Sequence, residues 1–238
     1  MRRVLMRRRR PAWLLANPSL ERRNDPPTCR SAHEPLDPMR VNTAVTWLSP
    51  IHKSSDFTKP VPFEKKVELF HARILGWQLE IADECANGID GQPPDQHSGF
   101  AVLHLCLSYF ETIAKYEQGY TGEGESKKHF KLGLASVFPS LRRAPSAVFE
   151  RRSELLYKAG RCGLYHGSQT SKGILLGEPP SALRFAPTRN YVQINSSLLP
   201  KVLKRHFERY CNRLLRRRSK VLRHSFELRF NHDNPNQA

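Results

Sequence analysis

The longest regular pattern of apolar residues begins shortly after a proline at position 62. Apolar side chains recur every three or four residues, the spacing of one helix face, at Phe63, Val67, Phe70, Ile74, Trp77 and Ile81. Proline fits the first turn of a helix because that turn has no partner for a backbone N–H. The pattern therefore predicts a first helix from Phe63 onward with these side chains on its buried side.

A second helix is predicted from Phe100 to Gln118, after a loop at 87–95 that is rich in Gly, Pro, Asn and Asp. Ser98 is a plausible N-cap for it. The segment is apolar almost all round, which predicts a central helix in contact with two neighbours. One face would carry Phe100, Leu103, Leu107, Phe110 and Ala114, and the other Leu105, Tyr109, Ile113 and Tyr116.

Two further helices follow a glycine-rich loop at 119–125. This loop lacks the Gly-x-x-x-x-Gly-Lys-Ser/Thr arrangement that binds nucleotide phosphates, so its glycines indicate turns. A helix is predicted from Ser126 to Phe138, ending at Pro139, and another from Pro145 through Ala159.

The C-terminal third mixes turn residues with short apolar runs. Residues 167–177 and 178–180 are predicted to be loops, and 183–185 and 191–194 to pair as a small hairpin. Ser196 or Ser197 would then cap a long helix through Leu215, with continuation toward Phe230 left open. The predicted fold is mainly α, a helical bundle with a small β-hairpin insertion before the last long helix.

Length and composition favour one domain with tails. The chain has 238 residues and 39% apolar residues, enough for one substantial core. Residues 1–55 have no sustained period and are expected to be a disordered basic arm, which Met39 as an internal start would largely remove. The domain is expected at 56–230 and a disordered tail at 231–238.

Positive charge is concentrated at two places. The formal net charge is +17, and residues 1–50 hold ten Arg against four acidic residues. Residues 201–224 hold ten Lys and Arg against Glu208 alone, including Arg216, Arg217 and Arg218. Such a segment predicts contacts with an RNA backbone, and a solvated helix face is the alternative.

Cysteine usage and hydropathy indicate a cytoplasmic protein. The five cysteines are scattered, without a Cys-x-x-Cys pair, which favours a reducing compartment. No apolar run reaches the roughly 18 to 20 residues of a membrane span, and the short run at 13–15 is too short for a secretory signal. Cys162 with His166, or His104 with Cys106, lacks the second ligand pair of a zinc site, so we expect no metal and no cofactor.

The most informative motif is Arg161-Cys-Gly-Leu-Tyr-His166. Five positions separate its Arg and His by about 140° around an ideal helix, which would keep them on different faces. Gly160, Gly163 and Gly167 weaken helix propagation, so a distortion here could bring the guanidinium and the imidazole toward one site.

This motif resembles that of the HEPN superfamily, in which nuclease members carry an Arg, four to six intervening residues and a His at the end of a bundle helix. Here Arg161 and His166 match with four residues between them, after Leu-Leu-Tyr-Lys-Ala-Gly and before Gly167. The resemblance covers roughly residues 60–230, including the segment Tyr-Phe-Glu-Thr-Ile-Ala-Lys at 109–115. The loop, strands and helix that follow the motif resemble those of a plasmid- and genome-encoded bacterial subgroup of the family. Many nuclease members have a polar residue where this chain has Cys162.

The resemblance implies a metal-independent endoribonuclease that acts as a homodimer and leaves 2′,3′-cyclic phosphate and 5′-hydroxyl ends. Arg161 would hold the phosphate and His166 would transfer a proton. It also implies a toxin–antitoxin or phage-defence setting, with an antitoxin or regulatory protein as a further partner.

Three other residues, Glu111, Tyr165 and Cys162, are candidates for supporting roles. Glu111 lies where HEPN proteins often place a polar residue facing the motif, and it would orient Arg161 or His166 or be a solvated or capping polar group. Ser108, one turn earlier, could share that site, but we interpret it as a solvated or capping group. Tyr165 could stack on a base, and Cys162 could tune the site, although each is also an ordinary packed side chain. The rival function is a non-catalytic HEPN module that binds RNA, a nucleotide or a protein.

Overall fold

The computed structural model describes residues 47–57, 60–89, 98–167, 170, 172–186 and 190–235. The expected disordered arm therefore lies outside the described residues up to position 46. Most of the described chain is helical, in α1 (Phe63–Ile74), α2 (Glu80–Asn87), α3 (Gly99–Gln118), α4 (Ser126–Val137), α5 (Pro139–Arg142), α6 (Ser146–Leu155), α7 (Gly163–Gly167), α8 (Leu199–Leu214) and α9 (Lys220–Asp233). Two π-helical segments, η3 (Leu75–Leu79) and η4 (Leu156–Cys162), join α1 to α2 and α6 to α7.

The first predicted helix is present but is interrupted by η3. Residues before the interruption, such as Phe70 and Ile74, are buried as expected, whereas Trp77 is 43% exposed and Ile81 40% exposed. A π turn adds a residue to the helical ladder, which rotates the following side chains by about 100° relative to a continuous α-helix. The prediction that Trp77 and Ile81 face the core was wrong for this reason.

Helix α3 is central, as its apolar character predicts. It contacts α2, α4, α8 and α9, and its buried side chains include Leu103, Leu107, Tyr109 and Phe110. Ser98 stands at the N-cap position but does not cap the helix, because its hydroxyl donates to the carbonyl of Cys85 at 2.7 Å.

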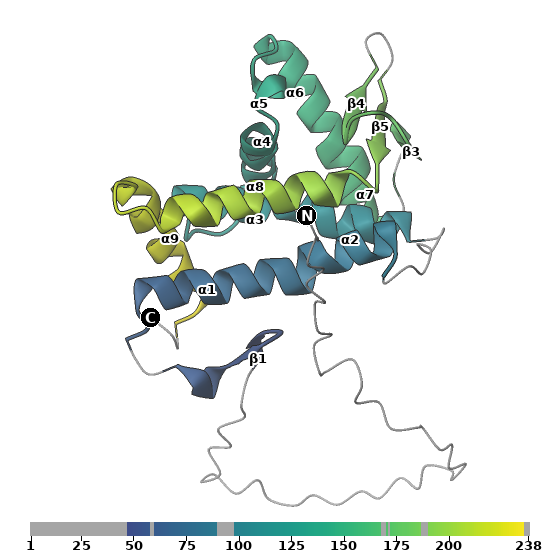
Figure 1. Cartoon of the computed structure of the whole chain (residues 1–238). Helices are drawn as coiled ribbons and strands as arrows, with labels where there is room; N and C mark the ends of the chain where they lie inside the picture. Colours follow the sequence, from purple (N-terminus) through teal and green to yellow (C-terminus); the bar gives the residue numbers. More distant parts are fainter. Residues whose placement is uncertain are drawn as a thin grey trace, which may run out of the picture. The chain divides into compact units, whose positions relative to one another are not determined.

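Helices α4 and α6 also begin where the sequence predicts them. Figure 1 shows α8 running beside α1 and α3. Helices α4, α5 and α6 lie beyond α3 and α8, on the side away from α1. The fold is thus mainly helical, with a small sheet beside α7.

That sheet has three strands rather than the two of the predicted hairpin. β4 (Leu183–Phe185) pairs antiparallel with β5 (Val192–Asn195), as expected. β3 (Ile174–Gly177), predicted to be loop, pairs parallel with β5, giving the order β3-β5-β4. Parallel strands are joined by a crossover connection rather than by a tight turn, so no local turn sequence marks their pairing. The predicted hairpin is therefore only part of the sheet.

A second, two-stranded sheet lies within the segment expected to be a disordered arm. β1 (Trp47–Ser49) pairs with β2 (His52–Lys53), and a short 3-10 turn, η2 (Ser54–Asp56), follows. Leu48 belongs to the hydrophobic core, and its carbonyl accepts a hydrogen bond from Arg73 of α1 at 2.9 Å. Residues 47–55 therefore belong to the fold, and their assignment to a disordered arm was wrong.

The long C-terminal helix is divided in two. α8 ends at Leu214, and Arg216, Arg217 and Arg218 form the turn before α9. α9 continues to Asp233, past the predicted domain end, and Asn234 is buried, with its amide donating to the carbonyl of Phe230 at 2.7 Å. The predicted helix through Leu215 is therefore confirmed as α8, and the continuation toward Phe230 that the sequence left open is a separate helix, α9.

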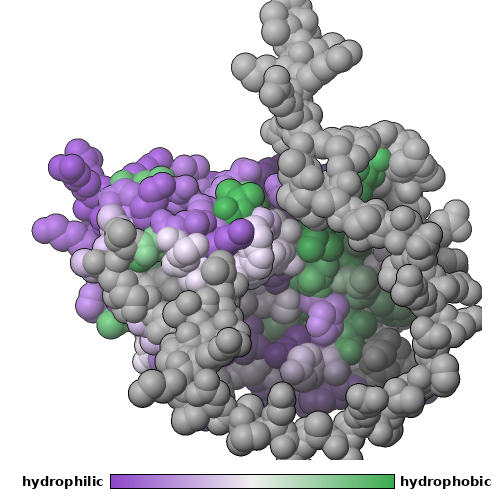
Figure 2. All heavy atoms as spheres, turned by 90° about the horizontal axis from the view of Figure 1, so that it is seen from below, coloured by the Kyte–Doolittle hydropathy of each residue, from purple (hydrophilic) through white to green (hydrophobic). Residues whose placement is uncertain are grey.

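The surface combines hydrophilic and apolar areas. Figure 2 shows one face on which apolar side chains lie exposed beside hydrophilic ones. Within the described residues, no helix is both long enough and apolar enough to span a bilayer.

Candidate functional site

The Arg161 motif lies in distorted helix, as its glycines predict. Arg161 is the next-to-last residue of η4, and α7 then carries Tyr165 and His166. A Cβ added to Gly160 would lie only 2.9 Å from Cδ1 of Leu107 on α3. The missing side chain therefore lets η4 approach α3 closely, which brings Arg161 to the polar residues of that helix.

Glu111 of α3 is the residue that holds Arg161. Its Oε2 lies 3.1 Å from Nη2 of Arg161, and both side chains are largely buried, 14% and 22% exposed. Oε2 also accepts a hydrogen bond from the hydroxyl of Ser126 at 2.6 Å, and Oε1 pairs with Nζ of Lys115 at 2.7 Å. The structure thus places Glu111 in contact with the motif arginine, and its supporting role stays a prediction.

The environment of Glu111 favours the carboxylate. Burial would raise its pKa, but hydrogen bonds from Lys115 and Ser126, with the charges of Lys115 and Arg161, lower it below the ordinary value. An ionised carboxylate fixes a guanidinium through a charge-assisted hydrogen bond. The Glu111 carboxylate is therefore a charged hydrogen-bond partner of the Arg161 guanidinium.

Tyr165 links the two ends of the motif. Its ring is 62% exposed, and the guanidinium carbon of Arg161 lies 4.8 Å from the ring centroid. The imidazole of His166, which is exposed, lies 5.2 Å away edge-on to the same ring. No hydrogen bond joins Arg161 to His166 in the part of the chain that is described. Within one chain the two side chains instead contact the same ring, that of Tyr165.

A polar pocket of about 300 Å³ opens beside Arg161. Its lining includes three cations, Lys115, Arg161 and Arg229, and two carboxylates, Glu111 and Asp233. Sequence reasoning missed Lys115, although its position four residues after Glu111 is a local signal for an ion pair. It also missed Arg229 and Ser126, which reach the site from α9 and α4 and leave no local signal.

Two other residues considered in the sequence, Cys162 and Ser108, lie beside Arg161. Cys162 is half-buried, and the described residues contain no group of three or more His, Cys, Asp or Glu side chains placed to share a metal ion. Ser108 accepts a hydrogen bond from the amide of Gln78 at 2.9 Å and lines the pocket beside Arg161.

The three consecutive arginines are exposed but lie apart from the motif. Arg216, Arg217 and Arg218 form the α8–α9 turn, at the end of α8 opposite to α7 (Figure 1). Helix α8 has 16 residues, which at about 1.5 Å per residue makes it roughly 24 Å long. An RNA bound to both regions would therefore have to extend along the helix.

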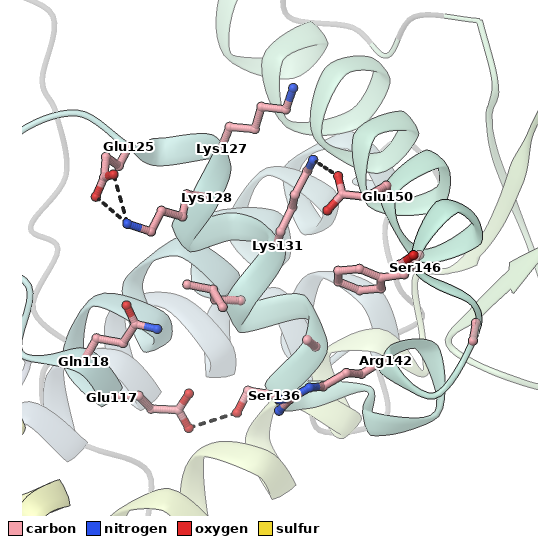
Figure 3. A pocket seen from close by; sticks show the side chains of 14 residues that line it. Glu117, Gln118, Glu125, Lys127, Lys128, Lys131, Ser136, Arg142, Ser146 and Glu150 are labelled. Carbon is pink, nitrogen blue, oxygen red and sulfur yellow. Dashed lines mark hydrogen bonds and ion pairs between the residues drawn. The ribbon is translucent and has the colours of Figure 1, made fainter.

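A larger cavity, of about 1020 Å³, lies between α4 and α6 and contains none of the residues predicted from the sequence. Figure 3 shows Lys128 paired with Glu125, and Lys131 of α4 paired with Glu150 of α6. Ser136, also in this cavity, donates to the carboxylate of Glu117 at 2.9 Å. These residues pair mainly with one another.

Replacing Glu111 by Gln should destabilise the protein by about 1–3 kcal/mol at pH 7, because the buried Arg161 would lose its anionic partner. The pKa of Glu111 is lowered in the folded state, so its contribution is present above the unfolded value and is lost as pH falls through the folded value. Urea unfolding of wild type and Glu111→Gln should thus show a difference at pH 7 that shrinks below pH 4.5. The matched control is Glu123→Gln, an exposed site, and an equal loss in both variants would contradict the prediction.

Comparison with family models, with curated proteins and with solved structures finds no match for this chain.

Proposed function

We propose that this protein is a metal-independent endoribonuclease of HEPN type, in which Arg161 and His166 act on the RNA phosphate. The observation that carries the proposal is the Glu111–Arg161 ion pair, which holds the motif arginine at 3.1 Å beside a pocket, with Tyr165 and His166 exposed in the following turn. The net charge of +17 supports a polyanionic substrate.

Arg161 is suited to stabilising the charge that develops on phosphate. A guanidinium has five N–H donors, and the contact with Glu111 involves only Nη2. The remaining donors can bind a non-bridging phosphate oxygen as a 2′-hydroxyl attacks. Glu111 would keep the guanidinium in place between turnovers.

His166 would transfer the protons that this attack requires. An imidazole is the most common general acid and base in enzymes, and His166 is exposed at the end of α7. The proton of the attacking 2′-hydroxyl would pass to the imidazole of His166 in one copy, and the leaving 5′-oxygen would take a proton from the imidazolium of His166 in the second copy. The products would be a 2′,3′-cyclic phosphate and a 5′-hydroxyl.

A homodimer would supply the second motif. Arg161 and His166 of one chain share no hydrogen bond in the described structure, and Tyr165 between them in the motif presents a large, 62% exposed side chain. A second copy covering such a surface would place two motifs together. A toxin or phage-defence role, with an antitoxin or other regulatory protein as partner, would follow from the same proposal.

The experiment is cleavage of a labelled single-stranded RNA pool in EDTA by wild type, Arg161→Ala and His166→Ala. Each substitution should lower the rate at least about 100-fold, because each removes a charge-stabilising or proton-transferring group. Arg143→Ala and His224→Ala, both at exposed positions, are matched controls that should retain activity. Circular dichroism and sedimentation would verify folding and dimerisation in every variant.

Three outcomes distinguish the nuclease from the non-catalytic module. Activity lost only in the two motif variants, with cyclic-phosphate ends on the products, would establish the nuclease. A folded wild type that binds the pool without cutting it would instead favour a non-catalytic HEPN module that binds RNA. Equal activity in wild type and Arg161→Ala would overturn the proposal.

A further inference from the structure

A second aromatic side chain accompanies Tyr165 at the motif. His104 of α3 lies with its ring nearly parallel to that of Tyr165, at an interplanar angle of 6° and a centroid distance of 6.3 Å. His104, Ser108 and Glu111 are spaced four and three residues apart, so they share the face of α3 that meets the motif helix. The Tyr165 ring is therefore aligned with a ring on α3 as well as with Arg161.

The position of the Tyr165 ring depends on the candidate catalytic residues. The guanidinium carbon of Arg161 lies 4.8 Å from its centroid, and Arg161 is fixed in turn by Glu111 at 3.1 Å. A cation over an aromatic face restrains both groups. A flat molecule that stacks on Tyr165 would thus be placed at a defined position relative to Arg161.

The space beside the two rings has an apolar floor. His104 and Tyr165 line a small pocket of about 70 Å³ together with Arg161 and Ser108, and buried Leu107 and Leu164 complete its lining. This volume is well below the roughly 300 Å³ of a site that encloses a small molecule. It fits the edge of one planar ring, and the rest of that ring would lie on the exposed Tyr165.

We propose that His104 and Tyr165 form a stacking site for one unpaired nucleobase, next to the phosphate bound by Arg161. The proposal rests on the proposed function, since it assumes that RNA is the ligand. Every base has a π face that stacks on an aromatic side chain, and bases in single strands can turn out to do so whereas paired bases cannot. The site would therefore select single-stranded RNA and favour purines, which have the larger stacking surface.

The test is binding of three fluorescent hexamers to the full-length protein in EDTA, measured by anisotropy. The hexamers are oligoadenylate, oligouridylate and an abasic ribose-phosphate of the same length, each with 2′-O-methyl groups so that the protein can bind them without cleaving them. Wild type should bind them in the order adenylate, uridylate, abasic. Tyr165→Leu should weaken adenylate binding about tenfold or more, as expected for the loss of one stacked base, and should weaken abasic binding much less, because Glu111 still holds Arg161.

Three further variants separate stacking from a structural role. Tyr165→Phe and His104→Phe keep an aromatic face and should retain the preference for adenylate, whereas His104→Leu should reduce it. A Tyr165→Leu variant that binds adenylate as wild type does, or that loses abasic binding equally, would overturn the proposal. So would a wild type that binds no hexamer, or a Tyr165→Leu variant in which sedimentation shows only a loss of self-association.

Failure of the stacking site can be distinguished from failure of the proposed function. Base-dependent binding without cleavage would remove the nuclease and leave the stacking site. Cleavage that depends on Arg161 but is insensitive to Tyr165→Leu and His104→Leu would leave the nuclease and remove the stacking site.

Discussion

Replacing Gly133 by Ala is expected to destabilise the protein severely, by more than about 3 kcal/mol. Gly133 lies on α4 where this helix crosses α3, and an added Cβ would stand 1.8 Å from the carbonyl oxygen of Phe110 and 2.6 Å from its carbonyl carbon. Both atoms are backbone, so no side-chain rotation can relieve the clash. The two helices would have to separate, which would loosen the rings of Phe110 and Phe130 at their interface.

Urea unfolding followed by circular dichroism measures this effect. The matched control is Gly177→Ala at the end of β3, where an added Cβ meets nothing within 4 Å. A total stability of about 5–15 kcal/mol is usual for a domain, so Gly133→Ala should lose a large share of it while Gly177→Ala stays close to wild type. Equal midpoints for the two variants would show that α3 and α4 can move apart at little cost.

The close contact at Gly133 also matters for the candidate site. Helix α4 carries Ser126, whose hydroxyl binds Glu111 at 2.6 Å, and α3 carries Glu111 itself. Separation of the two helices would therefore change the environment of the carboxylate that holds Arg161. A substitution at Gly133 would thus be expected to affect Arg161 as well, because α3 contacts both residues.

The sequence was most informative where a feature depends on neighbouring positions. The apolar period gave α3, α4, α6 and α8, because helix faces repeat every three to four residues. It did not reveal η3, which turned Trp77 and Ile81 outward, because a π turn leaves no compositional signal. The strand β3 was missed because its partner, β5, follows only after β4 along the chain.

The same distinction applies to the site. The distortion at Arg161 was predictable from the adjacent glycines, and the pairing of Lys115 with Glu111 was visible in their spacing of four residues. The hydrogen bond from Ser126 and the approach of Arg229 join segments distant in sequence, and packing decides them. The orientation of His104 toward Tyr165 likewise required the contact between α3 and α7.

Acid should destabilise the protein through His206, a buried histidine of α8. Its Nδ1 lies 2.9 Å from the hydroxyl of Tyr109 and its Nε2 3.2 Å from the hydroxyl of Ser136. Burial, together with the charges of Arg209 and Arg213, lowers the pKa of His206 to about 4 from its ordinary value of about 6.5. The unfolded chain therefore binds a proton at this residue between about pH 6.5 and 4 that the folded chain does not.

The sign of the effect follows from this difference in bound protons. Stability should fall as pH falls through this window. At pH 5, which lies 1.5 units below the ordinary pKa of histidine, the loss relative to neutral pH is about 2 kcal/mol. Urea unfolding at pH 7.5, 6.5, 5.5 and 5.0 measures the slope above the range in which most carboxylates titrate. His206→Gln keeps a polar side chain without this titration, so its slope should be flatter even where its stability at pH 7.5 is lower.

Glu117 provides an internal control of opposite sign. Burial raises its pKa, although the hydrogen bond from Ser136 and the charge of Arg213 oppose the rise. A carboxyl group with a raised pKa in the folded state gains stability as pH falls, since protonation relieves the cost of burying the charge. Glu117→Gln should therefore steepen the loss of stability on acidification, whereas His206→Gln should reduce it. Parallel slopes of stability against pH in wild type and His206→Gln would contradict the prediction. They would mean that His206 binds its proton in the folded protein as readily as in the unfolded chain, with its polar contacts rearranged to accept the charge.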